Sequence, residues 1–102
     1  IVDPCFLPIS ADPSSGQIIL DAIAGIRKAW PEVHIGGGLS NVSYGLPQRR
    51  VVNMAAIAQC IAAGMDAALI DPCTEGIMEA VYAAEAIVGR DEFCMNYVTK
   101  MR

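Results

Sequence analysis

Three short apolar runs, each followed by a helical pattern, limit most strongly how this chain can fold. The runs lie at residues 1–3, Val33–Gly37 and Asp66–Ile70. Between them, apolar residues recur at three- and four-residue spacing, as in Ile19, Ile23 and Ile26, which is typical of amphipathic helices. The expected helices are Gln17–Trp30, Gln48–Ala63, Thr74–Val88 and a last one that begins at Asp91.

Strands that alternate with helices indicate a parallel sheet, so the expected fold class is α/β with the order β-α-β-α-β-α-α. Three parallel strands alone leave two open edges, which the remainder of a larger sheet has to cover. A (β/α)8 TIM barrel takes about 250 residues. We therefore expect residues 1–102 to be the C-terminal part of such a domain: its last three β/α units and a terminal helix. The N-terminal strands are expected to be missing, because the chain begins at Ile1 in what resembles the middle of a strand.

Composition narrows the classes of partner. Hydrophobic residues make up 54% of the chain, above the roughly 45–50% of ordinary domains, so we expect a partner to cover some of the surface. The net charge is −4 and no basic run occurs, which argues against nucleic acid. No apolar run reaches the roughly 18 residues of a membrane span. The cysteines are scattered and His34 is the one histidine, so we expect reduced thiols, no metal site and a cytoplasmic protein.

The connection from Gly36 to Arg49, with the sequence GGGLSNVSYGLPQR, is long for a strand-to-helix turn, which usually takes about 2–6 residues. With the ends of the other two runs it would bring Asp3, Ser40, Asn41 and Asp71 to one edge. A carboxylate can accept two hydrogen bonds from adjacent N–H groups of a ligand, and a carboxamide can both donate and accept. The sequence shows no arrangement of serine, histidine and aspartate that is typical of nucleophilic catalysis.

The string Gly38-Leu39-Ser40-Asn41-Val42-Ser43, followed by Pro47, Arg49 and Asn53, closely resembles the turn of methyltetrahydrofolate:corrinoid protein methyltransferases. These are pterin-binding relatives of the methyltetrahydrofolate region of cobalamin-dependent methionine synthase and, more distantly, of dihydropteroate synthase. The Val2-Asp3-Pro4 opening and the tail with Cys94 and Lys100 also fit this family. The resemblance covers essentially the whole chain, and its GLSNVS string is fairly specific.

The resemblance implies a homodimeric TIM-barrel methyltransferase. Its reaction moves the N5 methyl group of methyltetrahydrofolate, the substrate, to the cobalt(I) of a corrinoid (cobalamin) that a partner protein carries. Asp3 would pair with the ring N–H and amino group of the pterin, and Asn41 would be the catalytic residue that stabilises protonated N5. Gly38 and Ser40 would shape the pocket wall, and Arg49 would face the substrate or the corrinoid. On this account the 102 residues alone should not catalyse.

The sequence departs from the family at Tyr44, where a member of the family carries a glutamine, so the methylated substrate stays open. Structural alternatives also remain. Asp3 could merely cap a turn before Pro4, and Asn41 could serve a left-handed backbone. The glycines at 36–38 could bind phosphate. Asp71 could equally well form a turn at the end of its segment or bind a ligand.

Two other functions remain open at this stage. One is a non-catalytic half-barrel that docks a corrinoid protein, which the excess of apolar residues permits. The other is a pterin enzyme of the dihydropteroate synthase kind, which we rank low because the Asp71-Pro72 segment lacks the basic residues that a pyrophosphate requires.

Overall fold

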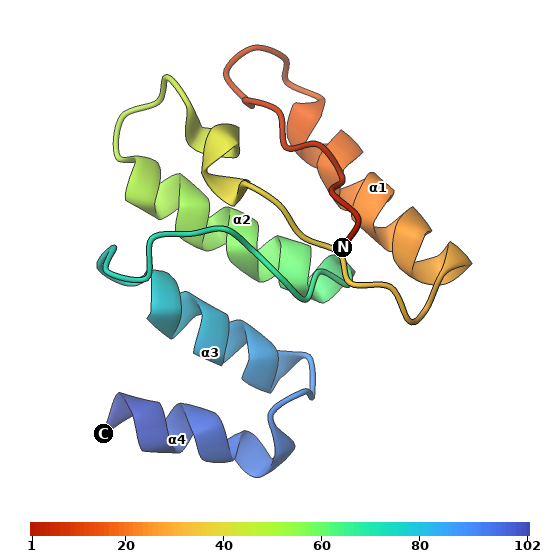
Figure 1. Ribbon diagram of the computed structural model, residues 1–102. Coiled ribbons are helices and arrows are strands. Elements are labelled where there is room, and N and C mark those ends of the chain that lie inside the picture. The colour runs from red at the N-terminus through yellow and green to blue at the C-terminus, as the bar shows by residue number, and fades with distance from the viewer.

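A computed structural model describes all residues from 1 to 102 and shows a helical protein (Figure 1). Its elements are α1 (Ser15–Ala29), the 3-10 helix η1 (Leu39–Ser43), α2 (Arg49–Ala63), α3 (Ile77–Ile87), the 3-10 helix η2 (Glu92–Cys94) and α4 (Met95–Met101). The first two long helices fall within two residues of the ends that the sequence predicts.

The prediction of an α/β fold, and with it of a TIM-barrel portion, is wrong, because the structure contains four α-helices and no β-strand. The three apolar runs are extended but touch only through isolated parallel bridges, Val2 with Ile35 and Gly38 with Leu69. The runs are too short to build a ladder of hydrogen bonds, and the residues that follow or end each run interrupt regular pairing. Pro4 and Pro72 lack the N–H that a ladder requires, and consecutive glycines at 36–38 weaken an extended segment.

The ends of the later helices also differ from the prediction. The helix predicted over Thr74–Val88 is shorter, because α3 begins at Ile77 after Gly76, whose φ is +85°. The last helix is preceded by η2, and the buried carboxylate of Asp91 holds its start by accepting the backbone N–H groups of Asn96 and Tyr97, both at 2.9 Å. Such acceptance of free N–H groups is what caps a helix.

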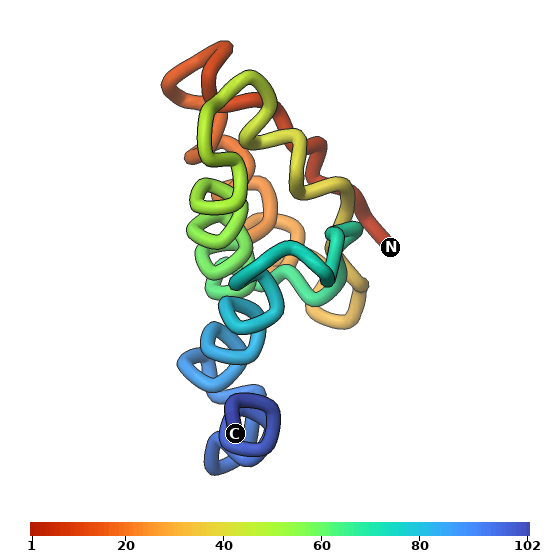
Figure 2. The backbone as a smooth tube through the Cα atoms, turned by 90° about the vertical axis from the view of Figure 1, so that its left-hand side faces the viewer, coloured from red at the N-terminus to blue at the C-terminus, as the bar shows by residue number.

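The elements form two layers. Helix α2 packs between α1 and α3, and the extended segments lie along one face of these helices, as the two views show (Figures 1 and 2). The smallest dimension of the molecule is 19 Å, about the thickness of one helix plus one extended layer. The outer face of the extended layer is uncovered, and Leu69 in it is 76% exposed.

The core lies between the two layers. Ile23 of α1, Ile57 of α2, Ile35 of the middle extended segment, Leu39 of η1 and Met65 after α2 are fully buried. The helical spacing, which predicts a buried face of Ile19, Ile23, Ile26 and Trp30, is correct for Ile19 and Ile23 but wrong for Trp30, which is 61% exposed. At the end of the chain, the four-residue spacing of Phe93, Tyr97 and Met101 also predicts packing, but Phe93 is 87% exposed. No helix combines the length and the apolar composition that crossing a membrane requires.

Candidate functional site

The ends of the three extended segments lie at one edge of the molecule, because the segments run in the same direction. Val2 N–H donates to His34 O at 2.7 Å, Gly36 N–H to Val2 O at 3.0 Å, and Leu69 N–H to Gly37 O at 2.9 Å. The residues that follow these contacts are Asp3, the loop from Gly38 through η1, and Asp71. These are the positions at which the sequence places its candidate site.

Asp3 lies directly over Gly37. A Cβ atom at position 37 would come within 2.6 Å of the Asp3 carboxylate, so a side chain there would displace it. The Oδ1 atom of Asp3 accepts the backbone N–H of Cys5 at 2.8 Å, which is the turn that the structural alternative predicts. That bond occupies one carboxylate oxygen, and the exposed side chain retains the other for a ligand.

Asn41 ties the η1 loop to the first extended segment. Its Nδ2 donates to the carbonyl oxygen of Phe6 at 2.6 Å. The alternative that Asn41 serves a left-handed backbone is wrong, because the positive-φ residues are elsewhere, for example Cys5 and Gln48. This bond uses one N–H of Nδ2 and fixes the orientation of the carboxamide, so that Oδ1 lies at its other end as a hydrogen-bond acceptor.

Arg49, the first residue of α2, holds the η1 loop from the other side. Its guanidinium donates to Ser40 O at 2.7 Å, to Ser40 Oγ at 3.0 Å and to Ser43 Oγ at 3.0 Å. A planar guanidinium with several donors suits this fork-like contact. The sequence predicts that Arg49 faces a substrate or the corrinoid; the structure shows it in contact with the loop that carries Ser40.

Ser40 and Asp71 line the same cavity, which has a volume of about 330 Å³, at the lower end of the range for ligand sites. Its wall combines polar and apolar side chains: Ser40, Asn53, Leu69, Ile70, Asp71, Thr74 and Ile77. The Oδ1 atom of Asp71 accepts Cys73 N–H at 2.9 Å, so Asp71 forms the same kind of turn as Asp3. Gly38 lies at the bridge to Leu69, next to this wall.

Asn53 and Thr74 are residues of this cavity to which the sequence assigns no role at the site. Asn53 Nδ2 donates to Ser40 Oγ at 3.3 Å, while its Oδ1 is buried without a hydrogen-bond partner. Asn53 already belongs to the string that resembles the methyltransferase family, and its position four residues after Arg49 is the signal for a shared role, since residues so spaced share a helix face. Thr74 gives no such signal, because its place depends on where α3 begins.

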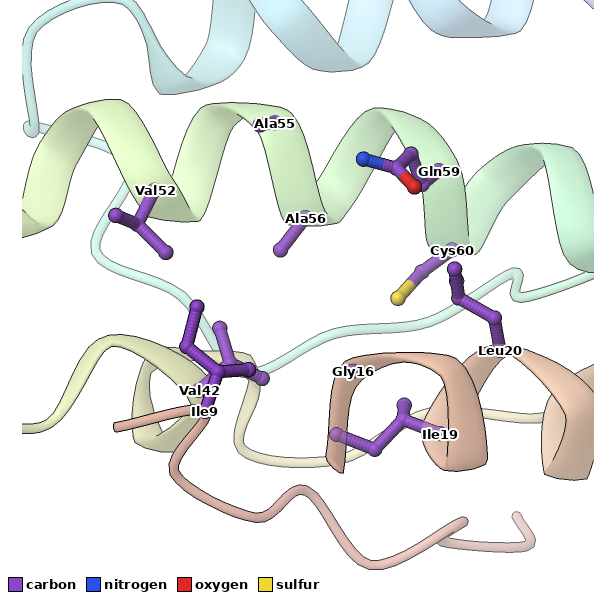
Figure 3. Close-up of a pocket in the computed structure, with 10 residues that line it drawn as sticks. All are labelled: Ile9, Gly16, Ile19, Leu20, Val42, Val52, Ala55, Ala56, Gln59 and Cys60. Carbon is purple, nitrogen blue, oxygen red and sulfur yellow. The ribbon is translucent and has the colours of Figure 1, made fainter. Parts of the chain in front are cut away.

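A second cavity, of about 170 Å³, lies between α1 and α2 and is mainly apolar (Figure 3). Its polar lining residues are Gln59 and Cys60, and the sulfur of Cys60 points from α2 toward α1. Burial raises the pKa of the Cys60 thiol to about 11, so this group stays protonated and unreactive at neutral pH. The cavity offers packing rather than chemistry. All four cysteines are free thiols.

A charged cluster surrounds Asp66, the first residue of the third extended segment, beside the start of the middle segment. Its Oδ1 accepts Ile35 N–H at 2.8 Å, its Oδ2 lies 2.8 Å from His34 Nδ1, and Arg27 is 3.6 Å away. Burial opposes ionisation of Asp66, but the hydrogen bonds from His34 and Ile35 and the charges of His34 and Arg27 outweigh it, so its pKa lies below the ordinary 3.8. This cluster joins the middle and third extended segments and lies away from the cavity that Ser40 and Asp71 line.

Comparison with known proteins finds a related methyltransferase. The chain is 37% identical over 101 residues to a methylcorrinoid:tetrahydrofolate methyltransferase of Eubacterium limosum. The match covers 99% of this chain and 37% of the relative, so the chain spans just over a third of the length of that protein. No protein-family model matches. The resemblance to corrinoid- and folate-dependent methyltransferases is confirmed, and this chain is related to a part of such an enzyme.

Proposed function

We propose that the protein carrying this chain transfers a methyl group between a corrinoid and N5 of tetrahydrofolate, and that the edge with Asp3, Ser40 and Asn41 forms part of its pterin site. The observation that carries the proposal is the 37% identity to a methylcorrinoid:tetrahydrofolate methyltransferase, which extends over nearly the whole chain. The corrinoid is a substrate, carried by a partner protein, and a second copy of the enzyme completes a homodimer.

The direction of transfer follows the relative. The family resemblance implies transfer from methyltetrahydrofolate to cobalt(I), whereas the name of the relative gives a methylcorrinoid as the donor and tetrahydrofolate as the acceptor. In that direction N5 attacks the methyl carbon, the bonding electron pair stays with cobalt, and N5 then loses its proton. Both directions pass through the same transition state, so a residue that stabilises it serves both.

Asn41 is suited to the charge that develops on N5. While carbon bonds to N5, that nitrogen becomes cationic and still carries its hydrogen. The Oδ1 atom of Asn41 can accept this N–H, because Nδ2 is held by Phe6 O at 2.6 Å and the amide orientation is thereby fixed. A hydrogen bond that strengthens as charge develops lowers the barrier. Asn41 is then an acceptor that stabilises a cation and need not take the proton itself.

Asp3 is suited to the pterin ring. One carboxylate oxygen is occupied by Cys5 N–H, and the other can accept an N–H of the pterin pyrimidine ring or its amino group. A charge-assisted hydrogen bond of this kind is stronger than a neutral one. Gly37 keeps space for this carboxylate, because a Cβ atom there would collide with it. Arg49, through its bonds to Ser40 and Ser43, keeps the loop rigid between these two groups.

An Asn41→Ala variant tests the proposed role of Asn41. We expect the rate of methyl transfer to fall about a hundredfold, while the dissociation constant of tetrahydrofolate changes by about threefold or less. The measurement is single-turnover transfer from a methylcorrinoid to tetrahydrofolate, followed by the absorbance of the corrinoid. Asn96→Ala, in exposed α4, is the matched control and should behave as wild type. Equal losses in rate and affinity would contradict a transition-state role, and absence of transfer by the wild-type protein that carries the chain would refute the function.

A non-catalytic docking module is the second candidate. It is favoured by exposed apolar side chains such as Leu69 and Ile87, which are 76% and 84% exposed. Saturable binding of a corrinoid protein without any binding of tetrahydrofolate would support it over the enzyme.

A further inference from the structure

The neighbours of the Ser40 hydroxyl group determine whether it can donate or accept a further hydrogen bond. Its Oγ accepts a hydrogen bond from Arg49 at 3.0 Å and another from Asn53 Nδ2 at 3.3 Å. A serine oxygen has two lone pairs and one proton. With both lone pairs engaged, the remaining capacity of Ser40 is to donate, and its side chain lines the cavity of about 330 Å³.

Asn53 is otherwise unexplained by the fold. The bond to Ser40 is the one hydrogen bond that its side chain makes, and its Oδ1 is buried without a partner. An unsatisfied buried acceptor costs free energy, so an asparagine at this place of α2 is a poor choice for stability alone. Its contact with Ser40 gives it a use at the cavity.

We propose that Asn53 is a positioning residue that, together with Arg49, holds the Ser40 hydroxyl as a hydrogen-bond donor toward an acceptor atom of the folate substrate. The inference rests on the proposed function and extends it to the way in which the site distinguishes acceptor from donor groups. Asn53 acts through Ser40 and need not touch the substrate. A ligand that presents an N–H to Ser40 in place of an acceptor would be rejected, since two donors would then face each other.

Reversal of the polarity at position 53 provides the test. In Asn53→Asp the amide donor becomes a carboxylate, to which Ser40 would donate its own proton and so withdraw it from the cavity. The new carboxylate lies four residues after Arg49 and three after Arg50 on α2, a spacing at which opposite charges attract. The variant is therefore expected to fold, which a thermal melt verifies.

We expect Asn53→Asp to weaken tetrahydrofolate binding about tenfold, the effect of one lost hydrogen bond, and to match Ser40→Ala. The double variant should bind no more weakly than Ser40→Ala alone. Asn53→Ala should lose less, because Arg49 still donates to Ser40. Gln59→Glu adds the same charge to an exposed position of α2 and is the matched control, expected to bind as wild type.

The outcomes separate the two proposals. If the wild type binds tetrahydrofolate and Asn53→Asp binds equally well, the positioning role is wrong and the proposed function stands. Additive losses in the double variant, or an Asn53→Ala loss as large as that of Asn53→Asp, would also overturn the positioning role, since both indicate a merely structural residue. If the wild type does not bind tetrahydrofolate, both proposals fail.

Discussion

At the scale of residues, the consecutive glycines at 36–38 have different reasons to be glycine. A Cβ atom at Gly36 would collide with the backbone of Ala67, within 2.6 Å of its carbonyl carbon, and one at Gly37 would collide with the Asp3 carboxylate. At Gly38 nothing lies within 4 Å of such an atom. The first glycine therefore permits two segments to approach, the second leaves room for a site residue, and the third faces open space, where a ligand can lie.

Alanine substitutions should separate these reasons. Gly36→Ala is expected to reduce the free energy of unfolding by about 1–3 kcal/mol, because the backbone of Ala67 cannot move aside without a shift of the whole segment. Gly38→Ala, the matched control, should change it by less than about 0.5 kcal/mol. Urea denaturation followed by circular dichroism measures both. Equal effects at the two positions would contradict the close approach seen between Gly36 and Ala67.

Much of the candidate site could be predicted from the residues. The loop after the second apolar run was recognisable by its length and by Ser40 and Asn41, and the structure does bring it beside Asp3 and Asp71. What the sequence could not give was how the polar groups are used. That Asn41 donates to Phe6, that Arg49 binds Ser40 and that Asn53 joins them depends on distances between segments far apart in the chain.

At the scale of elements, periodicity predicts the helices well and the extended segments poorly. A helix repeats its pattern over several turns, and α1 and α2 carry enough apolar residues to set both ends. An apolar run of three to five residues indicates only that a segment is buried. Whether it forms a strand depends on its neighbours, and the bridges Val2–Ile35 and Gly38–Leu69 are too isolated to make a sheet. The alternation of runs and helices therefore led to the wrong fold class.

The carboxylate of Asp66 adds a side-chain link between the middle extended segment and the residues after α2. Because its pKa lies below the ordinary 3.8 in the folded protein, the ionised carboxylate stabilises the fold above about pH 4, and this contribution is lost as the pH falls through the lowered pKa. The free energy of unfolding of the wild type should thus fall on acidification from about pH 5 to pH 3 more steeply than that of Asp66→Asn.

Urea titrations of both proteins across this pH range give the comparison. Asp21→Asn, at an exposed carboxylate of α1, serves as the control and should keep the steep acid dependence of the wild type. If Asp66→Asn retained the same dependence, its bonds to His34 and Ile35 would not be the origin of the lowered pKa.

At the scale of the whole molecule, the chain is a thin slab with one face formed by helices and one face uncovered. Its smallest dimension is 19 Å, with helices on one side and the uncovered extended segments on the other (Figure 2). The candidate site lies at the edge where these segments end. The related methyltransferase is longer, since the chain matches only 37% of it, and the activity proposed here belongs to the protein that carries the chain.

Equilibrium titration of the wild-type protein and of Asp3→Asn with tetrahydrofolate determines whether the edge around Asp3 binds the pterin. Asparagine can still accept Cys5 N–H and keep the turn, but it lacks the charge that binds the pterin. We predict saturable binding by the wild type, a loss of about tenfold or more in Asp3→Asn, and no competition from p-aminobenzoylglutamate, which lacks the pterin. Absence of saturable binding, or equal affinity in the two proteins, would contradict pterin binding at this edge.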